Sequence, residues 1–222
     1  MTDTPQTVTL ASRPFVAFGQ HVRRADTAVG AFVILHRREL TRARKALQKT
    51  RLELGIPATV RFDGAAAFDP ATRAARGLGD LDDNAVRKAI LRLIATVNAI
   101  PGMMRYTYMN LSHYPTSLDD PETGPQEREI VRQVLFARCF AVPTDGTHGP
   151  QGHETEPVLA DKVDRGSYAN AVLLDLADLV AEACARVVAA EPGSDEIRTM
   201  LETFQYWSNT EVLARAPAAA AS

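Results

Sequence analysis

Three carboxylate side chains recur along a strongly amphipathic segment of the sequence, residues 171–188. Asp175, Asp178 and Glu182 stand there at i, i+3 and i+7, a spacing that brings them onto one face of an α-helix. Carboxylates grouped in this way either hold a divalent metal ion or face water. A helical wheel places all three opposite the apolar stripe, which favours a solvated surface. Asp178 lies nearest to the boundary of that stripe and is the best metal-binding candidate of the three.

A metal site on this face needs one more carboxylate, delivered by a neighbouring strand. Two carboxylates and a phosphate oxygen together suit Mg²⁺ or Mn²⁺. Either ion is therefore the cofactor that such a site predicts. The alternative is an ordinary surface helix, stabilised by the i, i+4 pair of Glu182 with Arg186.

The segment ANAVLLDLADLVAEA at residues 169–183, preceded by VLADKVDRGSY, resembles the late motif of the DUF3800 group. In that group a helix of the LQLADLIA type follows a short strand that ends in Asp. The order of strand pair, basic helix, VRF segment, long helix, strand and late ADL helix is also similar. The resemblance implies an RNase H-like fold and metal-dependent nuclease chemistry. It makes Asp178, Asp161, Asp164 and Asp63 the catalytic candidates, with Asp178 and Asp161 as metal ligands.

The first strand departs from the pattern of that group. Family members open with a strand ending in Asp-Glu-Ser/Ala-Gly, which supplies the first metal carboxylate, whereas this chain has Gln20 and His21 there. Two-metal hydrolysis needs several carboxylates to neutralise the ions. The predicted function is thus a metal-dependent nucleic-acid hydrolase or a catalytically inactive relative that has lost the leading acid. The alternative is a non-catalytic module that binds protein partners or self-associates as a homo-oligomer.

A cluster of cations occupies residues 37–51, where seven Lys and Arg side chains accompany Glu39 as the only acid. A helix of this composition can neutralise nucleic-acid phosphates in a strongly salt-dependent way. The candidate contacts are Arg38, Arg42, Lys45 and Lys49. The alternative is a helix face that is solvated or that packs beside an acidic neighbour, such as the stripe at 175–182.

Two further groups of residues carry weaker signals. His148, His153 and Glu154 stand in the Gly-rich segment 144–157; they could bind a transition metal, but a loop positions ligands poorly and a solvated loop is favoured. Ser112, His113 and Tyr114 follow a predicted strand. We interpret them as the end of that strand. A small-molecule enzyme with a pocket near His113 is a third functional alternative.

The composition bounds the class of protein. The chain has 222 residues, is 45% hydrophobic and 23% charged, and carries a net charge of −2, values typical of a soluble globular protein without overall affinity for nucleic acid. No apolar run reaches the ~20 residues of a membrane span, and the N-terminal residues do not resemble a signal peptide. We therefore expect a cytoplasmic protein in which Cys139 and Cys184 are reduced, buried thiols.

Hydrophobic periodicity predicts one α/β domain at 13–215, between a flexible N-terminus at 1–12 and a disordered tail at 216–222. Its centre is predicted to be a mixed sheet of about 4–5 strands flanked by helices. The expected strands are 14–20, 28–36, 58–62, 103–111 and a short one at 158–163. The expected helices are 37–54, 84–99, 168–190 and 195–214, with 63–82 irregular and 125–143 undecided between helix and strand.

Overall fold

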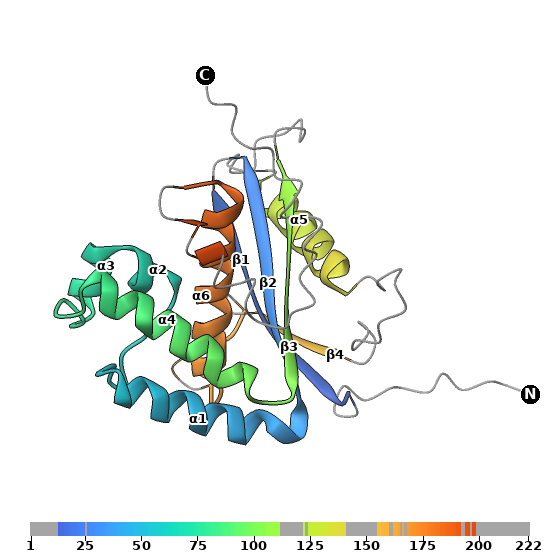
Figure 1. Ribbon diagram of the computed structural model, residues 1–222. Helices are drawn as coiled ribbons and strands as arrows, with labels where there is room; N and C mark the ends of the chain where they lie inside the picture. The colour runs from blue at the N-terminus through green and yellow to red at the C-terminus, as the bar shows by residue number, and fades with distance from the viewer. Residues whose placement is uncertain are drawn as a thin grey trace, which may run out of the picture.

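A mixed sheet lies at the centre of the computed structural model (Figure 1). Within the described residues it has four strands in the order β3-β2-β1-β4. The strands are β1 (Phe15–Arg24), β2 (Thr27–His36), β3 (Gly102–Asn110) and β4 (Thr155–Leu159). The structure describes residues 13–24, 26–111, 122, 124–140, 155–159, 162–164, 166, 168–191, 194–195 and 197–198.

The first three strands form an antiparallel meander, and β4 joins it in parallel on the far side of β1. The turn between β1 and β2 is short, since Arg24 pairs with Thr27. Side chains alternate between the two faces of the sheet. Along β1, Val16 and Phe18 join the main core cluster, whereas Ala17 packs with the opposite cluster.

Helices cover both faces of the sheet. Helix α6 (Ala171–Val188) lies across β1 and β2 on one face, and α5 (Gly124–Cys139) packs on the other (Figure 1). Outside α6 stands a second helical layer, which makes this side of the domain thicker. It consists of the 3₁₀ turn η2 (Arg37–Glu39) and the helices α1 (Leu40–Glu53), α2 (Gly64–Phe68), α3 (Pro70–Ala75) and α4 (Asp83–Asn98).

Aspartate side chains cap the N-termini of α2, α3 and α4. Asp63 accepts from the N–H of Ala66 at the start of α2, and Asp82 accepts from that of Ala85 at the start of α4. Both are standard N-cap bonds, which satisfy backbone donors that have no partner inside the helix. Helix α1 ends just before Gly55, whose φ is +75°, which agrees with the predicted end of that helix at residue 54.

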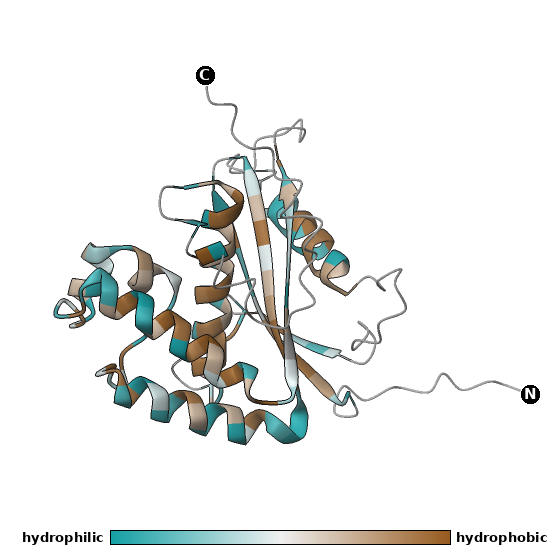
Figure 2. Ribbon diagram, in the orientation of Figure 1, coloured by the Kyte–Doolittle hydropathy of each residue, from teal (hydrophilic) through white to brown (hydrophobic). Residues whose placement is uncertain are grey.

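The predicted fold class is confirmed: the chain forms an α/β domain with a mixed central sheet flanked by helices. Figure 2 shows the reason for the position of α6, which is hydrophobic over most of its length, whereas α1 alternates between hydrophobic and hydrophilic residues. Cys139 and Cys184 are free and buried, as expected. None of the described helices is both long and apolar enough to span a membrane.

Several predicted elements differ from the observed ones. The segment 58–62 is not a strand, because Arg51 donates to the carbonyls of Pro57 and Val60 and so occupies groups that a sheet would use. The predicted irregular region 63–82 contains α2 and α3. The undecided region 125–143 is helical over α5, and β4 begins three residues before the predicted 158–163 strand. Residues 196 and 199–214 of the predicted last helix, and both predicted flexible ends, 1–12 and 216–222, lie outside the described residues.

Candidate functional site

The acidic face of α6 is enclosed, not solvated, so the surface-helix interpretation is wrong. Asp175 is 6% exposed and Asp178 8% exposed. Helix α2 and the segment before it pack across this face and separate it from water. Buried carboxylates must be hydrogen-bonded or paired with a cation, and the contacts of each one show what this face does.

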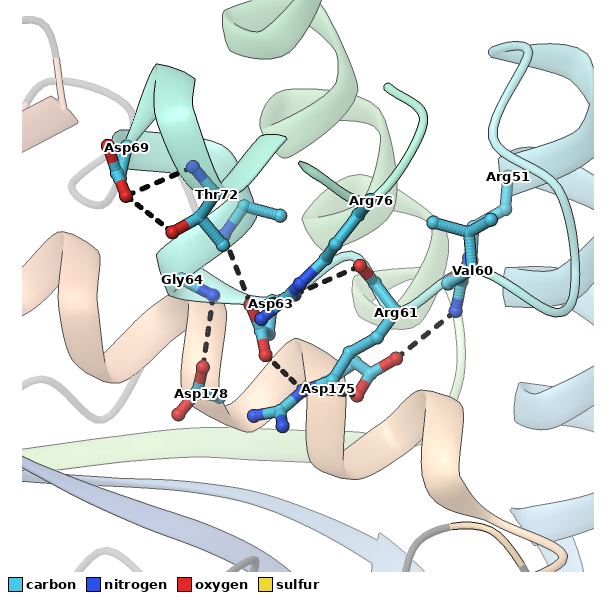
Figure 3. Close-up of polar contacts among 11 residues, drawn as sticks. Arg51, Val60, Arg61, Asp63, Gly64, Asp69, Thr72, Arg76, Asp175 and Asp178 are labelled. Atoms are coloured by element: carbon cyan, nitrogen blue, oxygen red, sulfur yellow. Dashed lines mark hydrogen bonds and ion pairs between the residues drawn. The ribbon is translucent and has the colours of Figure 1, made fainter. Parts of the chain in front are cut away.

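Asp178 is bound by the backbone of α2. Its Oδ2 accepts from the N–H of Gly64 at 3.0 Å (Figure 3). Gly64 is required here, because a Cβ atom would stand 2.5 Å from Glu182 Cβ and 3.0 Å from the Asp178 backbone oxygen. The contact brings Asp178 beside the Asp63–Gly64 peptide, so these two predicted site residues do lie close together.

Asp175 is paired with two arginines. Arg51 Nη1 lies 3.3 Å from its Oδ2, and Arg61 Nε lies 3.8 Å from its Oδ1. The Arg51 side chain is only 5% exposed, and its Nη2 donates to the carbonyls of Pro57 and Val60. Burial lowers the pKa of Arg51, and the charge of Asp175 is the main opposing influence.

Asp63 is fully buried and also paired with two arginines. Arg76 Nη1 donates to its Oδ1 at 2.8 Å, and Arg61 Nε forms an ion pair with its Oδ2. Burial alone would raise the pKa of Asp63. The hydrogen bonds from Arg76 and the Ala66 N–H, together with the charges of Arg61 and Arg76, outweigh burial and hold this pKa below its usual value.

We refer to Arg51, Arg61, Arg76, Asp63 and Asp175 as the arginine–aspartate cluster (Figure 3). Both oxygens of Asp63 and both oxygens of Asp175 face a guanidinium group. A metal ion would have to displace these cations and then sit beside their positive charge. No group of three His, Cys, Asp or Glu side chains in the described part of the chain could hold a metal ion. The residues in this arrangement therefore do not fit Mg²⁺ or Mn²⁺.

Of the other predicted ligands, Asp164 is the one that lies among the described residues. Asp164 is exposed in the segment before α6, where its Oδ1 accepts from the N–H of Gly166 at 3.1 Å. Asp161 lies outside the described residues, as do His148, His153 and Glu154 and the segment 112–114.

Gln20 occupies the β1 position at which the resemblance implies an acid. It follows Val16 and Phe18 at intervals of two residues along β1, so its side chain lies on the same face of the sheet, the one covered by α6. Its Oε1 is buried without a hydrogen-bond partner among the residues that the structure describes. An amide at this position supplies no negative charge to a metal ion.

The four predicted nucleic-acid contacts all lie at the protein surface. Arg38, Arg42 and Lys49 have 73%, 65% and 80% of their side chains exposed, and Lys45 is exposed as well. Their spacing of i, i+4, i+7 and i+11 places them in one row along η2 and α1. We call this row the α1 basic stripe.

Acids compensate the α1 basic stripe only in part. Glu39, whose side chain is 16% exposed, lies 3.5 Å from Arg38 and 3.6 Å from Arg42. Glu53 lies 3.9 Å from Lys49 and also pairs with Arg92 of α4. The row therefore keeps a net positive charge at the surface.

Sequence reasoning treated the 37–51 cations as one group, and the structure divides them. Arg51 points inward to Asp175, as the acidic-neighbour alternative expects, whereas the α1 basic stripe points outward. A helical wheel could have indicated the inward position of Arg51, because Arg51 follows Leu47 at i+4 and so shares the buried face of α1. Arg61 and Arg76 lie outside any periodic element that could have indicated their partners.

Comparison of the chain with protein-family models, with curated proteins and with solved structures gives no match. The site is therefore interpreted from its own contacts.

Proposed function

We propose that this chain is a catalytically inactive relative of RNase H-like nucleases that binds nucleic acid through the α1 basic stripe. The proposal is supported by the observed order of strand pair, basic helix, long helix, strand and late acidic helix, the order on which the resemblance depends. The observation that carries it is the arginine–aspartate cluster, in which acids of the predicted catalytic centre are the partners of arginines.

Charge explains why the cluster opposes metal-dependent hydrolysis. Two divalent ions bring about four positive charges, which several free carboxylates must neutralise. Here three guanidinium groups already accompany Asp63 and Asp175. The leading strand adds Gln20 instead of an acid.

The α1 basic stripe provides the binding surface. Its four side chains lie on the side of α1 opposite the buried Leu47, so phosphates can approach without any change in the core. Lys88 and Arg92 are exposed on α4, which packs beside α1, and extend the cationic surface. Binding through such contacts is sequence-independent and weakens steeply with salt.

The binding test compares two pairs of neutralised cations. The variant K45Q/K49Q should reduce the slope of log K against log[salt] for duplex DNA by about 1.8, which is ~0.9 for each lost phosphate contact. The control R128Q/R138Q removes the same charge from exposed positions on α5, on the opposite face of the sheet. Equal effects of the two variants would contradict binding by the stripe.

The second test concerns metal ions. A ligand that binds only the folded state raises Tm, so we expect Mg²⁺ and Mn²⁺ to leave the Tm of the protein unchanged and to elicit no cleavage of DNA or RNA. Metal-dependent cleavage that disappears in D178N would establish the active-nuclease alternative and overturn the proposal.

A further inference from the structure

An open cleft of about 510 Å³ lies beside the arginine–aspartate cluster. It is lined by residues of α1, of the segment 58–61 and of the beginning of α6. Sites for small molecules typically occupy about 300–1,000 Å³. The cleft is therefore large enough for an organic molecule, and its lining defines the chemistry of that molecule.

Arg61 is the most informative residue of the lining. Its Nε forms ion pairs with Asp63 and, at 3.8 Å, with Asp175, so two carboxylates lie on one side of the guanidinium group. Its two terminal nitrogens make no hydrogen bond or ion pair with any described residue, and in Figure 3 they point away from Asp63 without a dashed line. The side chain is 46% exposed and belongs to the lining of the cleft.

A guanidinium group held in this way presents a preformed pair of donors. Arginine binds phosphate and carboxylate oxygens in a bidentate geometry, and immobilising it beforehand reduces the entropy lost on binding. The two aspartates behind Arg61 thus act as its support. This supporting role differs from the metal-binding role that the sequence suggested for the acids of this site.

The remaining lining favours a phosphate that is attached to a larger group. Asp175 balances the charge of Arg51, and Asp63 lies behind Arg61, so the donors left for a phosphate are the terminal nitrogens of Arg61. The first turn of α6 adds the positive end of a long helix. Tyr168 offers an aromatic side chain that is held against Phe18, with ring centroids 6.4 Å apart. A ring of the ligand can pack beside Tyr168 while its phosphate meets Arg61.

We propose that this cleft binds a phosphomonoester of nucleotide size, whose phosphate is held by the terminal nitrogens of Arg61. This site is separate from the α1 basic stripe and does not require it. The same chemical group occurs in a free nucleoside monophosphate and at the 5′ end of a nucleic-acid strand, so the experiment distinguishes these two sources.

The first experiment is calorimetric titration of the full chain. The probes are the four ribonucleoside 5′-monophosphates, the four nucleosides, inorganic phosphate, and a short single strand with or without a 5′-phosphate. We expect at least one monophosphate to bind at least tenfold more tightly than its nucleoside and than inorganic phosphate. Tighter binding of the 5′-phosphorylated strand than of the free nucleotide would identify the strand end as the source.

Two variants test the assignment to the cleft. R61Q should weaken binding by about tenfold or more, because it removes a charge-assisted bidentate contact. R61Q also removes a partner of Asp63 and can therefore weaken the fold, so a second variant, Q48E, is needed. Gln48 is an exposed residue of α1 in the lining of the cleft. A carboxylate at this position repels phosphate without disturbing the core. Q126E makes the same change at an exposed position on α5 and should leave affinity unchanged.

The proposal is overturned by any of three results. The first is that no nucleotide and no 5′-phosphorylated strand binds at concentrations up to about 10 mM. The second is that inorganic phosphate binds as tightly as the nucleotides. The third is that Q48E and a correctly folded R61Q both bind the nucleotide with unchanged affinity.

Discussion

Replacing Asp175 by Asn tests whether the acids of α6 serve the stability of the fold. Asparagine keeps the volume and one acceptor oxygen but removes the negative charge beside Arg51. The Arg51 and Asp175 side chains are 5% and 8% exposed, so water cannot replace the lost partner. The carbonyls of Pro57 and Val60 still accept from Arg51, which limits the damage.

The size of the effect follows from the burial of this pair. Breaking a buried ion pair on one side typically costs 3–5 kcal/mol, and the remaining carbonyl contacts place D175N near the lower limit, at about 3 kcal/mol. For a domain of this length each kcal/mol corresponds to roughly 2–4 °C in Tm. We therefore expect D175N to lower Tm by about 6–12 °C.

The assay is urea unfolding followed by circular dichroism, with the free energy of unfolding extrapolated to water. D80N is the matched control, because Asp80 is exposed, and it should change stability by less than about 0.5 kcal/mol. The double variant R51M/D175N should lose less than the sum of its single variants, since the two residues interact. A loss below about 1 kcal/mol for D175N, or strict additivity, would refute the role of Asp175 as an internal counter-ion.

The remaining predictions concern the residues that join α2 to α6. The folded-state pKa of Asp63 is lowered, so its contribution to stability is complete above its unfolded pKa of about 3.9 and is lost as pH falls through the folded value. D63N should therefore reduce the loss of unfolding free energy that the protein shows as pH falls in the acid range. An acid range in which D63N and the unchanged protein lose stability equally would contradict this role. G64A should cost about 1–3 kcal/mol in urea unfolding, because its Cβ would clash with Glu182 and the Asp178 backbone oxygen. G79A, whose Cβ would meet only ordinary contacts at 3.6 Å, is the control, and equal losses would exclude the clash.

Periodicity in the sequence was sufficient for the strands and helices that carry a long apolar pattern. It predicted β1, β2, β3, α1, α4 and α6 close to their observed positions. It failed at the outward face of α6, because a helical wheel identifies the polar side of a helix but does not show whether a second layer covers that side. Asp175 and Asp178 are polar residues enclosed by α2 and the segment before it.

The segment 58–62 shows a second limit of sequence reasoning. Its β-branched residues indicate a strand, yet the carbonyls of Val60 and Arg61 accept from Arg51 and Arg76. Those arginines stand 9 and 15 positions away in the sequence, so no local pattern could reveal the contacts. The cluster could be found only once α1, α3 and α6 were placed in space.

The position of β4 has a consequence for the order of folding. The strands β1 and β2 form a hairpin and β3 pairs with β2 from at least 67 positions away, whereas β4 reaches β1 across 140 positions by pairing Thr155 with Phe15. Closing so long a loop costs chain entropy before any contact is gained, and contacts between distant residues slow folding. We therefore expect the meander to assemble early and the parallel edge strand to dock last, which makes β4 the strand whose amide hydrogens are protected latest during refolding.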